Sequence, residues 1–151
     1  MRTMFALAFI LLVAVAPARA ADPLIVRESP HPVSETLDRL KTILEKKGIT
    51  VFTRIDHAAG AKSAGLDLKP TQVLIFGNPK LGTPLMQSNR HIGVDLPMKA
   101  VAWEDDDGKV WLGYTSPGAL KARYGIEGKD AVFDKMTGAL DKFTAAAVKQ
   151  E

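Results

Sequence analysis

Apolar residues recur along this chain at spacings that predict alternating strands and helices. Residues 49–55 alternate between apolar and polar positions, which predicts a strand with one buried face. Residues 73–76 form a continuous apolar run, the pattern of a strand that is covered on both faces. Earlier in the chain, helical spacing predicts a helix that ends at Gly48, with an apolar face formed by Val33, Leu37, Leu40 and Leu44.

The remaining pattern completes an α+β domain. Residues 24–26 predict a short first strand, and residues 98–103 and 110–114 predict a hairpin around an Asp-Asp-Gly turn. A short helix after Ser116-Pro117 and a longer one with an apolar face at residues 132–147 follow. The order β-α-β-β-(α)-β-β-α-α predicts a single mixed sheet of about five strands packed by helices.

The first twenty residues have the pattern of a signal peptide. Arg2 precedes an apolar run at residues 5–16, and Ala18-Arg19-Ala20 supplies small residues for cleavage after Ala20. The run is too short to span a bilayer as a helix. We therefore expect residues 21–151 to form a single domain that is periplasmic or secreted and not embedded in a membrane after cleavage.

Composition narrows the classes of function. Residues 21–151 carry 18 basic and 17 acidic side chains that are interspersed, so no basic patch for nucleic acid is predicted. The chain has no cysteine, which excludes disulfides and thiolate catalysis. Its histidines, His31, His57 and His91, lack metal-ligand spacing, and we predict neither a metal site nor a cofactor.

Five blocks of sequence follow one another along the chain: RIDHA at 54–58, GLDLKPT at 65–71, VLIFGNP at 73–79, GTPLM at 82–86 and DLPMK at 95–99. Together they resemble one bacterial family, the domain of unknown function 302 (DUF302). The resemblance covers roughly residues 33–126 and implies a compact sheet-and-helix domain. Because it implies no established activity, there are no catalytic residues to carry over.

Asp56 and His57 stand where the strand at 49–55 ends. A histidine beside a carboxylate could act as a general base. Neighbouring strand residues point to opposite sides, however, so Asp56 is poorly placed to orient His57. The alternative is structural, with Asp56 capping the turn at residues 58–64 and His57 bonding to a buried backbone group.

The segment 77–83 joins a strand to an expected helix. Its G-x₄-G-T spacing is that of a phosphate loop, but Thr83 occupies the position where a nucleotide-hydrolysing loop needs lysine. Backbone N–H groups in such a loop could still hold an anion. The alternative is a tight turn in which Asn78 or Thr83 caps the helix.

If the strands at 49–55 and 73–76 are parallel neighbours, these polar groups meet at one sheet edge. We therefore expect a small polar or anionic ligand to be bound by Asp56, His57, Asn78, Thr83, Asp95 and Lys99. A periplasmic binding or sensing module is the preferred function. The alternatives are an enzyme that uses Asp56 and His57 for proton transfer, and an interaction module that assembles through a sheet edge or the C-terminal helix. Homo-oligomerisation stays open.

Overall fold

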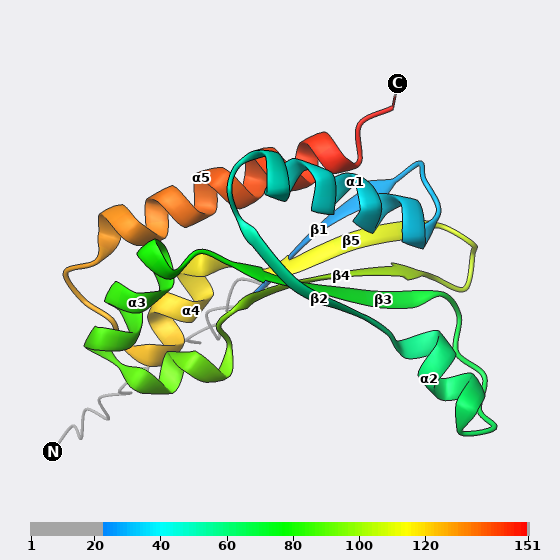
Figure 1. The fold of residues 1–151 in the computed structure, drawn as a ribbon, viewed down its shortest axis with the longest axis horizontal. Coiled ribbons are helices and arrows are strands. Elements are labelled where there is room, and N and C mark those ends of the chain that lie inside the picture. The colour runs from blue at the N-terminus through cyan, green and yellow to red at the C-terminus, as the bar shows by residue number, and fades with distance from the viewer. Residues whose placement is uncertain (1–22, 151) are drawn as a thin grey trace, which may run out of the picture.

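The computed structural model describes residues 23–150, and the chain in this range alternates strands with helices (Figure 1). Its elements are β1 (Leu24–Ser29), α1 (Val33–Lys46), β2 (Thr50–Asp56), α2 (His57–Ser63), β3 (Thr71–Gly77), α3 (Pro79–Ser88), the 3-10 helix η1 (Arg90–Val94), β4 (Met98–Glu104), β5 (Val110–Thr115), α4 (Pro117–Tyr124) and α5 (Asp130–Ala147).

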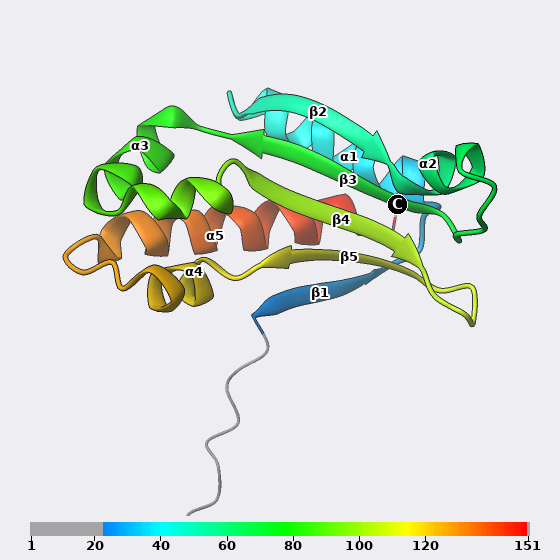
Figure 2. The same cartoon turned by 90° about the horizontal axis from the view of Figure 1, so that it is seen from below.

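The five strands form one open sheet in the order β1-β5-β4-β3-β2 (Figure 2). The predicted α+β class, the number of strands and their order along the chain are confirmed. Every pairing is antiparallel, however, so the expectation of a mixed sheet, with β2 and β3 parallel, is wrong. The physical reason is that the connection through α2 stays at one end of the sheet, so β3 begins beside the end of β2 and runs in the opposite direction. A parallel pair would need a connection that crosses a face of the sheet.

Helices α1 and α5 cover one face of the sheet and enclose the core (Figure 1). The predicted helical stripe of α1 is buried: Leu37, Leu40 and Leu44 are inaccessible to solvent, as is Leu74 of β3 beneath them. Burial of these apolar side chains is the main source of stability in a domain of this size.

The opposite face of the sheet is covered by no helix of the described chain and is only partly buried. Burial alternates along β3, where Leu74 and Phe76 are buried while Val73 and Ile75 are half-buried. The expectation that residues 73–76 are covered on both faces is therefore wrong. A continuous apolar run marks a doubly covered strand only where helices pack on both sides.

The two ends of the sheet carry different elements. Helix α2 lies beyond the end of β2, whereas α3, η1 and α4 gather at the opposite end, where β3 and β5 finish and β4 begins (Figure 1). The first half of α5 extends over this second end. The gathered helices and the strand ends thus surround a volume that the sheet itself does not fill.

Candidate ligand-binding pocket

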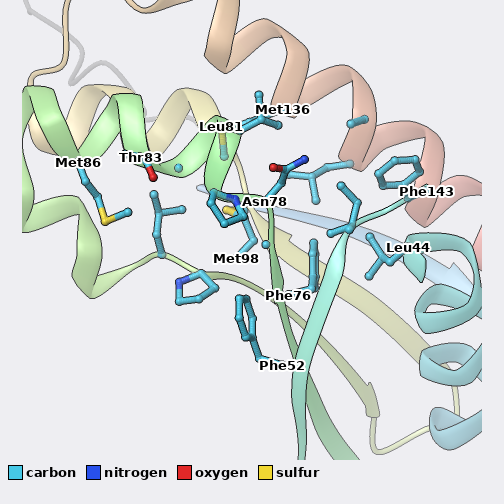
Figure 3. A pocket seen from close by; sticks show the side chains of 18 of the residues that line it. Leu44, Phe52, Phe76, Asn78, Leu81, Thr83, Met86, Met98, Met136 and Phe143 are labelled. Carbon is cyan, nitrogen blue, oxygen red and sulfur yellow. The ribbon is translucent and has the colours of Figure 1, made fainter. Parts of the chain in front are cut away.

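A pocket of about 280 Å³ lies between the ends of β2 and β3, helix α3 and helix α5 (Figure 3). Its lining is almost entirely apolar. Three aromatic rings and three thioethers make up much of the surface, and they come from five different elements: Phe52, Phe76, Phe143, Met86, Met98 and Met136. Such a lining, with few polar groups, is typical of sites for small molecules.

An irregularity in β2 places Phe52 at this pocket. The pairing of β2 with β3 shifts register between Val51 and Thr53, so Phe52 has no partner in the ladder. Bulges of this kind redirect a side chain. Phe52 is 53% exposed, yet it lines the pocket beside the end of β3.

At Gly77, the end of β3 lies close to two residues of the pocket lining, Phe52 and Pro97. A Cβ atom on Gly77 would lie 3.4 Å from Cβ of Pro97 and 3.5 Å from Cε2 of Phe52. Both neighbours line the pocket as well. A methyl group at these distances would be in ordinary van der Waals contact with both residues, whereas a longer side chain would extend into the lining.

Two polar side chains from the β3–α3 segment line the pocket, Asn78 and Thr83 (Figure 3). Asn78 is the N-cap of α3, and its Oδ1 accepts a hydrogen bond from the backbone N–H of Lys80 at 2.9 Å. The alternative interpretation of Asn78 as a cap is thereby confirmed. Its Nδ2 donates no hydrogen bond to residues 23–150, and neither does the Thr83 hydroxyl.

Asp95 lies at the same end of the sheet, where it holds η1 against α4. Its Oδ2 accepts hydrogen bonds from the Tyr124 hydroxyl at 2.7 Å and from Arg123 at 2.9 Å. The hydrogen bond from Tyr124 lowers the pKa of Asp95 most, and Arg123 acts in the same direction. The Asn89 amide adds a bond of 2.9 Å to the carbonyl of Tyr124. These bonds fasten the wall that α3 and η1 form.

Lys99 stands beside Asp95 and not in the pocket. Its side chain is exposed on the open face of the sheet, where its Nζ lies 3.4 Å from the backbone oxygen of Asp95. Asp95 and Lys99 thus neighbour the pocket without lining it.

Asp56 and His57 lie at the opposite end of the sheet from Asn78, so the prediction that they form one site with Asn78 is wrong. In the antiparallel pair, Asp56 is opposite Gln72 while Thr50 is opposite Gly77. Five residues separate Gln72 from Gly77, which places the two ends about 17 Å apart. The expected convergence required parallel strands.

The local structure at Asp56 confirms the alternative in which it is a cap. Its Oδ1 accepts from the backbone N–H of Ala59 at 2.9 Å at the start of α2, and its Oδ2 accepts from Gln72 Nε2 at 2.9 Å. His57 is exposed on the first turn of α2, so the expected bond from His57 to a buried backbone group is wrong. The predicted turn at 58–64 is mostly helix.

Sequence reasoning missed most of the pocket. The apolar spacing that includes Met136 and Phe143 correctly predicted the apolar face of α5. The same spacing occurs whether such a face fills a core or lines a pocket. Phe52 had no signal at all, because its role depends on the shift of register in β2. No group of three or more His, Asp or Glu side chains suited to a metal ion occurs among residues 23–150.

Fold and pocket together define a two-layer α+β domain with an apolar pocket at one end of its sheet. The sequence pattern of the family described as "Domain of unknown function DUF302" matches residues 25–143. The chain belongs to this family.

Similar proteins fall into two groups. A chain described as "Crystal structure of uncharacterized conserved protein DUF302 from Bacillus stearothermophilus" shares the fold, with a TM-score of 0.71 and 22% identity over 85% of this chain and 97% of that chain. Proteins named "Fluoride-specific ion channel FluC 1" from Brucella suis biovar 1 and Brucella abortus biovar 1 are each 48% identical over 126 residues, or 81% of this chain. The match covers 50% and 47% of those proteins, so this chain spans about half the length of the curated relatives that it matches.

Proposed function

We propose that this domain is a binding module for a small molecule, which it holds in the pocket between β2, β3, α3 and α5. The observation that carries the proposal is the pocket itself, whose apolar lining is contributed by elements from across the sequence. The polar or anionic ligand expected from the sequence is not favoured, because none of the residues that line this pocket is charged.

The pocket provides the usual source of affinity for a small ligand. Transfer of apolar surface from water contributes about 25 cal/mol per Å². The three methionine side chains are flexible and polarisable, so they can adapt to the outline of a ligand. Asn78 and Thr83 supply the few polar groups that such sites use for orientation.

The names of the Brucella relatives refer to proteins about twice as long as the matched segment. Among residues 23–150, no helix is long and apolar enough to cross a membrane. The binding proposal rests on the pocket, and the channel activity that those names describe belongs to the longer proteins.

The methionines offer a direct test of binding. Residues 21–151 contain three methionines, and all of them line the pocket: Met86, Met98 and Met136. In protein labelled with ¹³C at the methionine methyl groups, titration with indole should shift these signals in a saturable way. Absence of any saturable shift for indole and for other small aromatic or aliphatic probes would contradict the proposal.

Two variants of α5 show whether the probe occupies this pocket. Ala139 lines it, so Ala139→Leu should fill space and abolish the shifts. Ala145 is exposed on the same helix, and Ala145→Leu is the matched control that should bind indole like the unmodified chain. Equal binding by both variants would place the probe elsewhere.

An interaction module is a second candidate, favoured by the open face of the sheet. One apolar row crosses all five strands through paired positions: Val26, Gly113, Val101, Val73 and Ile55. A second copy of the chain packed there would make a dimer. Sedimentation across a range of concentrations tests it, because Val101→Glu should remove self-association; a monomer at all concentrations contradicts it.

The enzyme alternative gains no support from geometry. Both carboxylate oxygens of Asp56 accept hydrogen bonds, from Ala59 and from Gln72, and the exposed side chain of His57, the first residue of α2, makes no hydrogen bond to Asp56. We therefore do not propose an acid–base pair.

Export of the protein remains a proposal drawn from the sequence, because residues 1–20 lie outside the described residues. The apolar run at 5–16 and Ala18-Arg19-Ala20 support a periplasmic or secreted location with cleavage after Ala20. N-terminal sequencing of the protein from its host should find Ala21 first, and retention of residues 5–16 would contradict this.

A further inference from the structure

We propose that the ligand of this pocket is a small neutral molecule, mainly aromatic or aliphatic, with one oxygen that accepts a hydrogen bond from the side-chain amide of Asn78. This inference rests on the proposed binding function and adds the chemical class of the ligand. It follows from three properties of the pocket, which are its charge, its volume and its polar group.

The lining makes a neutral ligand the best match. None of the lining residues is charged, and nearly the whole surface is carbon or sulfur. A charged group that enters such an environment without a partner pays a large desolvation cost. Lys80 is the nearest basic residue in sequence to Asn78, but it is exposed and does not line the pocket.

The volume indicates the size of ligand that the pocket can take. An apolar cavity of about 150 Å³ can hold benzene, so a pocket of about 280 Å³ has room for a ring with a substituent. A single aromatic ring with a short substituent is of this size. The rings of Phe52, Phe76 and Phe143 on the walls suit a partner with a flat face.

The hydrogen bonding of Asn78 indicates that the polar group of the ligand should be a hydrogen-bond acceptor. Its Oδ1 is held by the N–H of Lys80, which fixes the plane of the amide at the start of α3. The amide nitrogen, a donor only, is left without a partner among residues 23–150. Figure 3 shows the Asn78 side chain among the lining residues, between α3 and α5. A ligand that offers an acceptor here satisfies this donor.

A pair of matched probes isolates this contribution. Acetophenone carries a carbonyl oxygen where α-methylstyrene carries a CH₂ group, and the two molecules are otherwise of the same size and shape. Because a net hydrogen bond changes affinity roughly threefold to tenfold, acetophenone should bind more tightly by that factor. The methionine methyl signals give both dissociation constants in the same experiment.

Substitution of Asn78 tests its role without loss of the helix cap. Asn78→Asp keeps a side-chain oxygen for the N–H of Lys80 and replaces the donor by an acceptor. It should remove or reverse the preference for acetophenone, and the affinity for both probes should fall because the new carboxylate is desolvated when either probe binds. Asn78→Ser, a neutral residue that also caps helices, has a hydroxyl donor that ends one bond short of the amide nitrogen, so it should reduce the preference without the added charge.

The outcomes separate this inference from the proposed function. If both probes bind the unmodified chain equally, or if both variants keep the preference, the inference is overturned and the binding module stands. If both variants weaken the two probes alike, Asn78 acts only through the shape of the pocket, which also overturns it. If neither probe nor indole binds the unmodified chain, the proposed function itself fails.

Discussion

The phenolic hydroxyl of Tyr124 donates a hydrogen bond of 2.7 Å to Oδ2 of Asp95, and this contact joins the helix α4 to the wall of the pocket. Asp95 directly precedes Leu96 and Pro97, which line the pocket, and follows η1. Together with the bonds from Arg123 to Asp95 and from Asn89 to the carbonyl of Tyr124, this long-range bond holds the segment that contains η1 against α4. Its loss should affect both stability and the pocket.

Removal of the Tyr124 hydroxyl should lower the melting temperature by a few degrees. Tyr124→Phe keeps the ring and deletes the donor, which leaves the half-buried carboxylate of Asp95 with one partner fewer. Arg123→Gln is the matched control, because its side chain is 62% exposed and exposed ion pairs contribute little. Equal effects of the two variants in thermal unfolding would contradict the argument.

The stabilisation due to Asp95 should disappear in acid. The hydrogen bond from Tyr124, followed by the interactions with Arg123, holds the pKa of Asp95 below its ordinary value of 3.8 in the folded protein. A depressed pKa contributes stability that is present above the unfolded value and is lost as pH falls through the folded value. The difference in free energy of unfolding between the unmodified chain and Asp95→Asn should therefore be constant near neutral pH and shrink below about pH 4. A difference that is unchanged down to pH 2 would contradict it.

Adjacent residues of β3 should differ sharply in their contribution to stability. Leu74 is 0% exposed beneath α1, so Leu74→Ala should cost about 2–5 kcal/mol through lost burial and a cavity. Ile75 points to the open face and is half-buried, so Ile75→Ala should cost about 1 kcal/mol. Denaturant titration measures both, and equal costs would show that the open face is covered in solution.

Two glycine substitutions should have opposite signs. A Cβ on Gly113 would lie 3.0 Å from Cζ3 of Trp103, so Gly113→Ala should destabilise the domain by about 1–3 kcal/mol. Gly138 is in α5, and apart from the adjacent backbone of its own helix no atom lies within 4 Å of its Cβ position, so Gly138→Ala should stabilise by about 0.5–1 kcal/mol. Chemical denaturation gives both values, and a neutral Gly113→Ala would mean that the Trp103 ring moves away freely.

The sequence determined the local structure, because helices, caps and turns depend on residues a few positions apart. The apolar period of residues 33–44 predicted α1, and the alternation at 49–55 predicted β2. The caps at Asp56 and Asn78 were among the interpretations that it left open. Those residue types at those positions satisfy the first N–H groups of a helix whatever the rest of the chain does.

Only the tertiary structure decided which of these segments meet. Strand order depends on pairings between distant residues, and the antiparallel pairing of β2 with β3 separates Asp56 from Asn78. The pocket beside Asn78 combines Phe52, which a shift of register redirects, with Met136 of α5. No local pattern encodes a volume left between remote elements, because its size depends on how their side chains pack around it.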